Sequence, residues 1–458
     1  MARFCSTRRR SRLFLAAIWV ACLNALSTPC GATPSSSATP YESVDRYFSK
    51  LLVGLQKSQL DSGLRVLLSV DREHPVVALA TCFQAGRAEP GHAFILPDLA
   101  AYLRHRRVTP AKPDHSLVRA RGAGESEHLA HDHSCFTSLM PASELAFGLW
   151  LEARRLEPVA EVPEVAATVA RQRYEAWKLL RPHAAAELEL ARLAWGAGSA
   201  AAARTPEGSL AELAFALNQR FSVDNAVLVL VGDFDPDQAS RWIREYFSPR
   251  DPKHKARQPA ATSVEPAPTA AVEAGPPQST AGQSSVFVGF AHPAGSVGEH
   301  AALELLARLL SLDGESRAHA AFLKAAGALD FGAEVRGWGE HSLFVTHLKL
   351  SAAANPARAE AELLRRVTAY ATRAPRVAEL ERAKKGALVS WLSELASPER
   401  RAALLGRFEV MLGDARLAAR QHLALSAVTP EDIQRASKSL VAARRVTLRA
   451  STATGSKP

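Results

Sequence analysis

The sequence lacks most of the signatures that assign a chain quickly to a class of protein. It has no Gly-rich phosphate loop, no Gly-x-Ser-x-Gly elbow and no Cys-x-x-Cys pair, so nothing indicates a nucleotide-binding protein, an α/β-hydrolase or a thiol redox enzyme. No run of about 20 apolar residues occurs, so no transmembrane helix is expected. Basic residues form no run interleaved with aromatics, which argues against a nucleic-acid partner.

Cysteine is scarce, with 5 in 458 residues, and three of these lie within the first 32 residues. Cys82 and Cys135 remain. They could form a disulfide or stay free, because both lie in apolar stretches where a free cysteine packs well. The sequence therefore excludes a disulfide framework and a cysteine-based metal site.

The formal charge of +10 comes partly from the N-terminus. Four arginines within residues 8–12 precede an apolar stretch at 13–26, the pattern of a secretory signal peptide. We expect residues 1–32 to be this signal peptide and the mature protein to be exported to the periplasm or cell envelope. A lipoprotein anchor at Cys22 or Cys30 stays open as an alternative.

The mature chain is expected to contain two domains, since it has 47% hydrophobic residues and a length sufficient for two cores. A stretch rich in Pro, Ala, Thr and Ser separates them and predicts a linker. The predicted parts are a flexible leader (33–44), an N-terminal domain (45–249), the linker (250–285), a C-terminal domain (286–450) and a tail (451–458).

The two halves share a pattern of apolar strand, Gly-containing turn and helix, at residues 76–105 and again at 284–312. Alternating and helical periodicities mix within each half. The expected fold class is α+β: two homologous domains, each a mixed or antiparallel sheet with helices packed on one face. Further strands are predicted at 64–71, 226–234 and 341–350, and further helices at 144–156, 163–180 and 357–373.

Four stretches in chain order resemble the insulinase/pitrilysin family of zinc metallopeptidases, the group that contains the mitochondrial processing peptidase. They are residues 60–91 (LDSGLRVLLSVDREHPVVALATCFQAGRAEPG), 222–247, 309–335 and 427–448. The resemblance spans about residues 45–450. It implies two homologous α+β domains that close on a peptide.

The zinc motif of that family is missing. Active members carry His-x-x-Glu-His on a helix, where two histidines bind zinc and the glutamate acts as general base. Here Asp98, Ala101 and Tyr102 occupy those positions, and Gln172 stands where a distal glutamate ligand belongs. The resemblance therefore implies a catalytically degenerate member with no catalytic residues and no cofactor of its own, zinc being expected only in an active partner.

A rival metal site is conceivable at a histidine cluster. His131 and His133, two residues apart, would point to one face of a strand and could chelate a metal together with His128. The chain would then be an atypical metal-dependent hydrolase. The alternative is that these histidines are strand residues facing solvent or a cavity.

In the second half, the resemblance suggests residues for substrate binding. Lys324 stands at the position of an arginine and Phe331 at that of a tyrosine that hold the substrate in active relatives, and Arg317 is another candidate cation. The plainer alternative makes Lys324 a surface residue and Phe331 a core residue.

These observations favour a non-peptidase homologue that binds a peptide and forms the inactive, chamber-forming or substrate-binding subunit of a heterodimer with an active zinc peptidase. A stand-alone peptide-binding or scaffold protein of the cell envelope is the alternative.

Overall fold

The structure of the chain is a computed structural model, and it describes the stretches 54–88, 94–105, 114–194, 209–248, 284–292, 296–311, 317–337 and 342–450. The predicted signal peptide, leader and tail lie outside the described residues, as does the predicted linker except for its last two residues. All described residues belong to one compact unit, which begins at Asp45.

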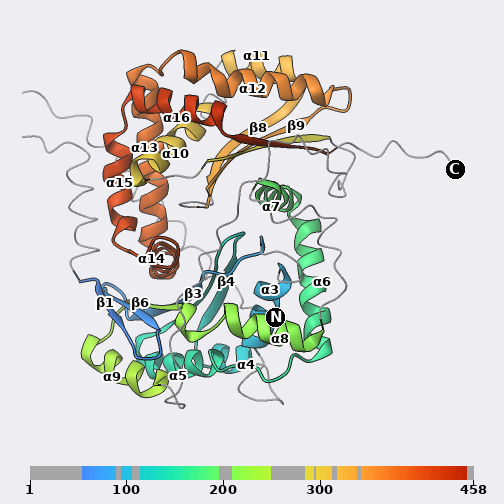
Figure 1. The fold of residues 1–458 in the computed structure, drawn as a ribbon. Coiled ribbons are helices and arrows are strands. Elements are labelled where there is room, and N and C mark those ends of the chain that lie inside the picture. The colour runs from blue at the N-terminus through green and yellow to red at the C-terminus, as the bar shows by residue number, and fades with distance from the viewer. Residues whose placement is uncertain are drawn as a thin grey trace, which may run out of the picture. The chain divides into compact units, whose positions relative to one another are not determined.

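The first half of the chain builds a six-stranded mixed sheet (Figure 1). Strands β2 and β6 are parallel and every other pair is antiparallel. In spatial order the strands are β1 (Gln56–Gln59), β2 (Arg65–Val70), β6 (Ala226–Gly232), β3 (Val76–Phe83), β5 (Ser134–Pro141) and β4 (Gly124–Leu129).

The sequence of β6 explains its central place in the sheet. All seven residues, AVLVLVG, are buried, as a strand covered on both faces requires. The chain then turns into α9 (Pro236–Phe247), where the Asp235 side chain accepts a hydrogen bond from the Gln238 backbone N–H and caps the helix.

Helices cover one face of this sheet and form the first core with it. Buried side chains such as Leu79, Leu149 and Leu230 meet there. The helices of this half are α3 (Leu96–Arg104), α4 (Asp114–Ala120), α5 (Leu145–Arg155), α6 (Glu164–Leu180), α7 (Pro182–Ala194), α8 (Leu210–Arg220) and α9.

The second half builds a four-stranded antiparallel sheet in the order β10 (Arg444–Ala450), β7 (Ser285–Ala291), β9 (Leu343–Leu350) and β8 (Ala328–Arg336). Its helices are α10 (Val297–Ser311), α11 (Arg317–Ala326), α12 (Pro356–Thr372), α13 (Val377–Ala396), α14 (Pro398–Leu412), α15 (Leu417–Ala427) and α16 (Pro430–Ala442). The predicted α+β class, with a mixed and an antiparallel sheet, is confirmed.

Each half also contributes one helix that packs on the sheet of the other half. Helix α14 packs on β3, β5 and β6, and α7 packs on β7 and β10 (Figure 1). Gly406 makes the first contact possible, because a Cβ there would lie 2.5 Å from Cys82 Sγ. Helices therefore lie on both faces of each sheet, and the second face carries the helix from the other half.

Cys82 and Cys135, left open by the sequence, are joined by a disulfide. They lie opposite each other on β3 and β5, and both are buried under α14. The bridge ties two central strands of the first sheet together.

Candidate functional site

The helix predicted to be the degenerate zinc helix is present as α3. Asp98 lies in its first turn and is 1% exposed, and Ala101 is fully buried. Tyr102 is partly buried against the first core. The three side chains are thus part of the packed interior of the first half.

Arg87, from the loop after β3, donates hydrogen bonds to Asp98. The guanidinium Nη2 lies 2.8 and 2.9 Å from the two carboxylate oxygens, and Nε lies 3.0 Å from Oδ2. Both groups are buried, so this is a bidentate pair in a low-dielectric setting.

Further contacts fix Arg87 in place. Its guanidinium carbon lies 4.2 Å from the centre of the Trp177 ring, a cation–π contact. Nη1 donates to the Leu129 carbonyl at 3.4 Å, and Arg192 Nη2 donates to the carbonyl of Arg87 at 2.7 Å. The cation therefore lies where α3, α6 and the end of β4 meet.

Gln172, predicted to stand in the place of the distal ligand, does not face Asp98. Gln172 is exposed on α6, whereas the buried face of that helix runs through Ala166, Ala170 and Tyr174. The α6 residue that approaches Asp98 is Arg173, whose Nε lies 3.7 Å from Oδ1. A one-residue change of register turns a helical side chain by about 100°.

These residues do not fit a zinc ion. Asp98 already has both oxygens engaged by a guanidinium, Ala101 offers neither ligand nor base, and the side chain facing Asp98 from α6 is a cation. A catalytic zinc needs three protein ligands and an open position for water. No step of peptide hydrolysis can be derived from this site.

The histidine cluster differs from the prediction. His131 and His133 lie in the turn between β4 and β5, not on a strand, and they flank Asp132. His133 Nδ1 is 2.7 Å from Asp132 Oδ1. Within the described stretches, no group of three or more His, Cys, Asp or Glu side chains is arranged to hold a metal ion.

His128 lies on β4 beside this turn, with its ring centre 5.4 Å from that of His133. Burial, followed by the nearby His133 and Arg407, lowers the pKa of His128 to about 4. The imidazole is therefore neutral at physiological pH.

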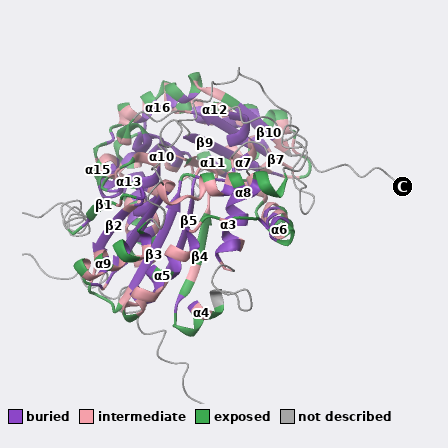
Figure 2. Cartoon of the chain, turned by 60° about the horizontal axis from the view of Figure 1, so that its bottom comes forward, coloured by how far each residue is buried: buried purple, intermediate pink, exposed green. Residues whose placement is uncertain are grey.

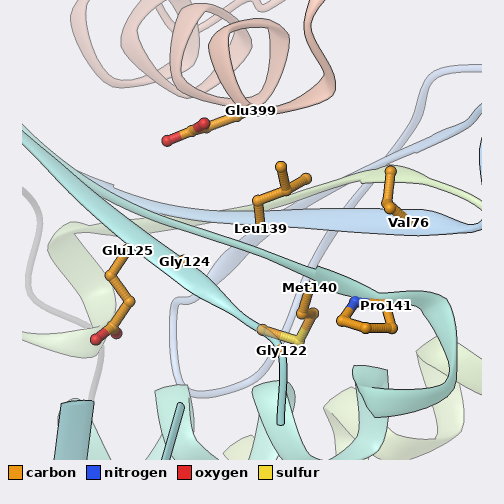
Figure 3. A pocket seen from close by; sticks show the side chains of 8 residues that line it. All are labelled: Val76, Gly122, Gly124, Glu125, Leu139, Met140, Pro141 and Glu399. Atoms are coloured by element: carbon orange, nitrogen blue, oxygen red, sulfur yellow. The ribbon is translucent and has the colours of Figure 1, made fainter. Parts of the chain in front are cut away.

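Strand β4 is an edge strand, and it is the most exposed part of this side of the sheet (Figure 2). A cavity of about 330 Å³ lies at its start, lined by Gly124, Leu139 and Met140 among others, with Glu399 of α14 above it (Figure 3). A second cavity, of about 540 Å³, lies along the strand beside Arg119 and Arg173. The free edge of β4 therefore has a cavity on each side.

The side chains of β4 alternate between two environments. Glu125 pairs with Arg155 at 2.6 Å and Glu127 pairs with Arg173, both toward the helices of the first half. Ser126 donates to Glu399 of α14 on the other side. This alternation is that of a regular strand.

The residues proposed for substrate binding are not gathered at this edge. Phe331 is buried against Phe322, with ring centres 5.3 Å apart, so the plainer alternative of a core residue is the one observed. Lys324 is exposed on α11. Arg317 begins α11, and its side chain lies outside the described part.

A buried ion cluster below β4 was not predicted from the sequence. Glu152 accepts hydrogen bonds from Thr81, Arg104 and Arg155. Burial alone would raise the pKa of Glu152, but the two arginines lower it to about 2. The cluster fastens α5 to the strands and keeps a carboxylate ionised in the core.

Residues 209–387 match the family model described as the peptidase M16 inactive domain. The resemblance to the insulinase (M16) family is confirmed. No curated protein sequence matches the chain.

Solved structures of three bacterial proteins share the fold. A protease from Helicobacter pylori is 15% identical, with a TM-score of 0.71, over 87% of this chain and 99% of that one. An M16 inactive domain from Pseudomonas fluorescens is 19% identical, with a TM-score of 0.68, over 88% and 99%. The periplasmic protease PqqL from Escherichia coli is 16% identical, with a TM-score of 0.61, over 98% of this chain but 49% of that one.

The M16 match and the residues at the zinc position together indicate a non-peptidase homologue. Among the described residues, no helix combines the length and hydropathy that crossing a bilayer requires.

Proposed function

We propose that this M16 homologue binds peptides in an extended conformation along the free edge of β4 without cleaving them, as the inactive subunit of a chamber completed by an active zinc-bearing homologue. The observation that carries the proposal is the position of Arg87. Its guanidinium engages Asp98 and the Leu129 carbonyl, at the end of an edge strand that pairs with no described strand on its outer side.

The backbone of β4 suits the addition of a strand. The Ala130 N–H donates to the His133 carbonyl at 2.9 Å, which closes the turn to β5. Bonded pairs alternate in an antiparallel ladder, so Ser126 and His128 direct their backbone groups to β5 in the same register. The backbone groups of Glu125 and Glu127 face the open edge and could pair with a peptide.

The proposal of a second subunit rests on chain length. This chain aligns with 49% of PqqL, so that protease has room in one chain for a second unit of this size. A separate chain would supply the corresponding unit here.

An exported location is supported by the buried disulfide between Cys82 and Cys135, because such bonds persist in oxidising compartments. The predicted signal peptide points the same way. We place the protein in the periplasm or cell envelope.

Strand addition can be tested with matched variants at Glu127. Glu127→Pro removes an N–H that faces the open edge, so β4 keeps its ladder to β5 while a peptide loses one bond and meets the proline ring. Glu127→Gln keeps the N–H and serves as the control, since both variants lose the pair with Arg173. We expect Glu127→Pro to weaken binding of an unstructured peptide by about tenfold relative to Glu127→Gln. Equal affinities of the two variants would rule out binding at this edge.

The subunit proposal predicts that the protein co-purifies from its native source with a zinc peptidase of similar size. Elemental analysis should then find zinc in the complex and less than stoichiometric zinc in this chain alone. Recovery as a homodimer that binds peptides would favour the stand-alone binding protein. Stoichiometric zinc in the isolated chain would contradict the proposal.

A further inference from the structure

Arg407 on α14 differs from the other inward-pointing arginines. Its Nε is buried without a hydrogen-bond partner, and no ion pair or hydrogen bond joins its guanidinium to any described residue. Its guanidinium carbon lies 5.7 Å from the centre of the Phe408 ring. The side chain as a whole is partly exposed, and a guanidinium carries five N–H donors, so Arg407 can still receive an acceptor from outside.

The buried arginines elsewhere in the described chain all have acceptors. Arg87 donates to Asp98, Arg104 and Arg155 to Glu152, Arg192 to a backbone carbonyl and Arg401 to Asp71. Arg155, Arg173, Arg366 and Arg444 also have one buried nitrogen without a partner, but each of them donates a hydrogen bond through another nitrogen. Arg407 differs from these four described arginines because none of its nitrogens has an acceptor, so its guanidinium could receive one from outside the described chain.

The surroundings of Arg407 come from both halves. Asp132 of the β4–β5 turn, Glu394 of α13 and Glu304 of α10 exert an attraction on it, and Arg336 of β8 repels it. None of these carboxylates comes within ion-pair distance. Burial lowers the pKa of Arg407, and the carboxylates offset this only in part. Asp132 is already engaged by His133, and Glu304 accepts from Gln421 at 3.3 Å.

Arg407 lies beside the proposed peptide edge. It acts electrostatically on His128 of β4, whose side chain is on the same face of the strand as Ser126. Ser126 in turn donates to Glu399, two turns before Arg407 on α14. A peptide added to β4 would present every second side chain toward this helix.

We propose that Arg407 is a specificity-determining residue that selects peptides carrying a carboxylate, which its guanidinium receives from an acidic side chain or from the peptide's C-terminus. This inference rests on the proposed function and adds a ligand chemistry to it. A carboxylate would satisfy the guanidinium with two parallel hydrogen bonds. It would also relieve the repulsion between Arg407 and Arg336.

Four unlabelled peptides of about ten residues, built on serine and alanine, test the inference by calorimetry. Two contain a central Glu-Glu pair and two a central Gln-Gln pair, each with a free or an amidated C-terminus. Adjacent residues point to opposite faces of a strand, so one residue of each pair faces α14 in either register. We expect the full-length mature protein to prefer at least one carboxylate-bearing peptide by about tenfold over the amidated Gln peptide. Comparing the Glu peptides with the Gln peptides, and the free C-termini with the amidated ones, distinguishes an acidic side chain from the peptide's C-terminus as the carboxylate.

Two variants assign the preference to Arg407. Arg407→Met should abolish it, and Arg400→Met, an exposed arginine on the same helix, should leave it intact. Arg407→Met should also keep or raise the melting temperature, because it removes a partly buried cation whose Nε has no partner; a purely structural arginine would lower it.

Peptides that bind equally well with and without carboxylates would overturn this inference and leave the proposed function standing. If none of the four peptides binds the wild-type protein, both fail. A preference that survives in Arg407→Met would assign it to another residue and overturn the role of Arg407.

Discussion

Arg87 donates to both carboxylate oxygens of Asp98, at 2.8 Å to one and 2.9 Å to the other, in the interior between α3 and α6. The family resemblance implies that active relatives bind a zinc ion on the helix that corresponds to α3. Here a guanidinium from a neighbouring loop supplies the positive charge.

Breaking the Arg87–Asp98 pair should strongly destabilise the folded protein. Asp98→Asn leaves Arg87 buried and without its counter-charge, so we expect a loss of about 3–5 kcal/mol in the free energy of unfolding, measured by urea denaturation. Glu157→Gln breaks the exposed Arg154–Glu157 pair and should cost less than about 1 kcal/mol. The double variant Arg87→Met/Asp98→Leu should recover much of the loss, since no unpaired charge remains. A small effect of Asp98→Asn would mean that the pair is not what holds α3.

The contact between α14 and the first sheet depends on a glycine. In Gly406→Ala the new Cβ would lie 2.5 Å from Cys82 Sγ and 3.3 Å from Val229 Cγ2, so α14 must move away. We expect a loss of about 1–3 kcal/mol in the free energy of unfolding. Gly386→Ala, in the middle of α13, is the matched control. Its Cβ would meet only the flexible end of Arg308 at 3.4 Å, so this variant should be neutral or stabilised by up to about 1 kcal/mol.

The fold was predictable because its signals are local. Apolar alternation placed β2, β6 and β9, and helical spacing placed α5, α6 and α12, each within two residues of the observed ends. The sequence alone also predicted that Asp98, Ala101 and Tyr102 lie on one helix, and all three lie on α3. The packing of α7 on the second sheet and of α14 on the first sheet joins residues far apart in the sequence, so no local sequence pattern predicts it.

The details of the candidate site were less predictable for two physical reasons. To tell which residue of α6 faces α3, the buried face of the helix must first be identified. The buried alanines at 166 and 170 define that face and place Arg173 nearer to α3 than Gln172. That signal was available in the sequence. The role of Arg87 was not, because a loop arginine shows its partner only once the loop has folded over α3. The turn at His131 and His133 contains neither glycine nor proline to mark it.

The disulfide predicts a thiol count. The mature protein should show no free thiol under denaturing, non-reducing conditions, because Cys82 and Cys135 are bonded and the other cysteines lie in the predicted signal peptide. Cys82→Ala/Cys135→Ala should lower the free energy of unfolding by about 2–5 kcal/mol, since the bridge closes a loop between residues 53 positions apart. Two free thiols in the protein purified from its native compartment would contradict both the bond and its support for export.

The dependence of stability on pH should reveal the contact between α7 and the second sheet. Glu187 of α7 hydrogen-bonds Glu334 of β8, and Arg336 Nε lies 3.0 Å from Glu187 while its Nη2 lies 2.8 Å from Glu334. Burial, followed by the neighbouring carboxylate, raises the pKa of Glu187 from 4.5 to about 8. The folded protein therefore keeps a proton that the unfolded chain has released, and stability falls as the pH rises toward about 8.

Histidines oppose this slope at lower pH. Burial lowers the pKa of His347, which faces the same contact, and of His128 and His300, so these residues make stability rise up to about pH 6.5. The window from about pH 6.5 to about pH 8 lies above the range of these histidines and contains the titration of Glu187; burial also raises the pKa of Glu304 on α10, so the comparison with Glu187→Gln assigns the slope. Across this window we expect the free energy of unfolding to fall by roughly 2 kcal/mol, and Glu187→Gln to remove most of that fall. Glu175→Gln, at an exposed site on α6, should leave the slope unchanged. If Glu187→Gln retains the full slope, the proton is held elsewhere and the two carboxylates do not share it.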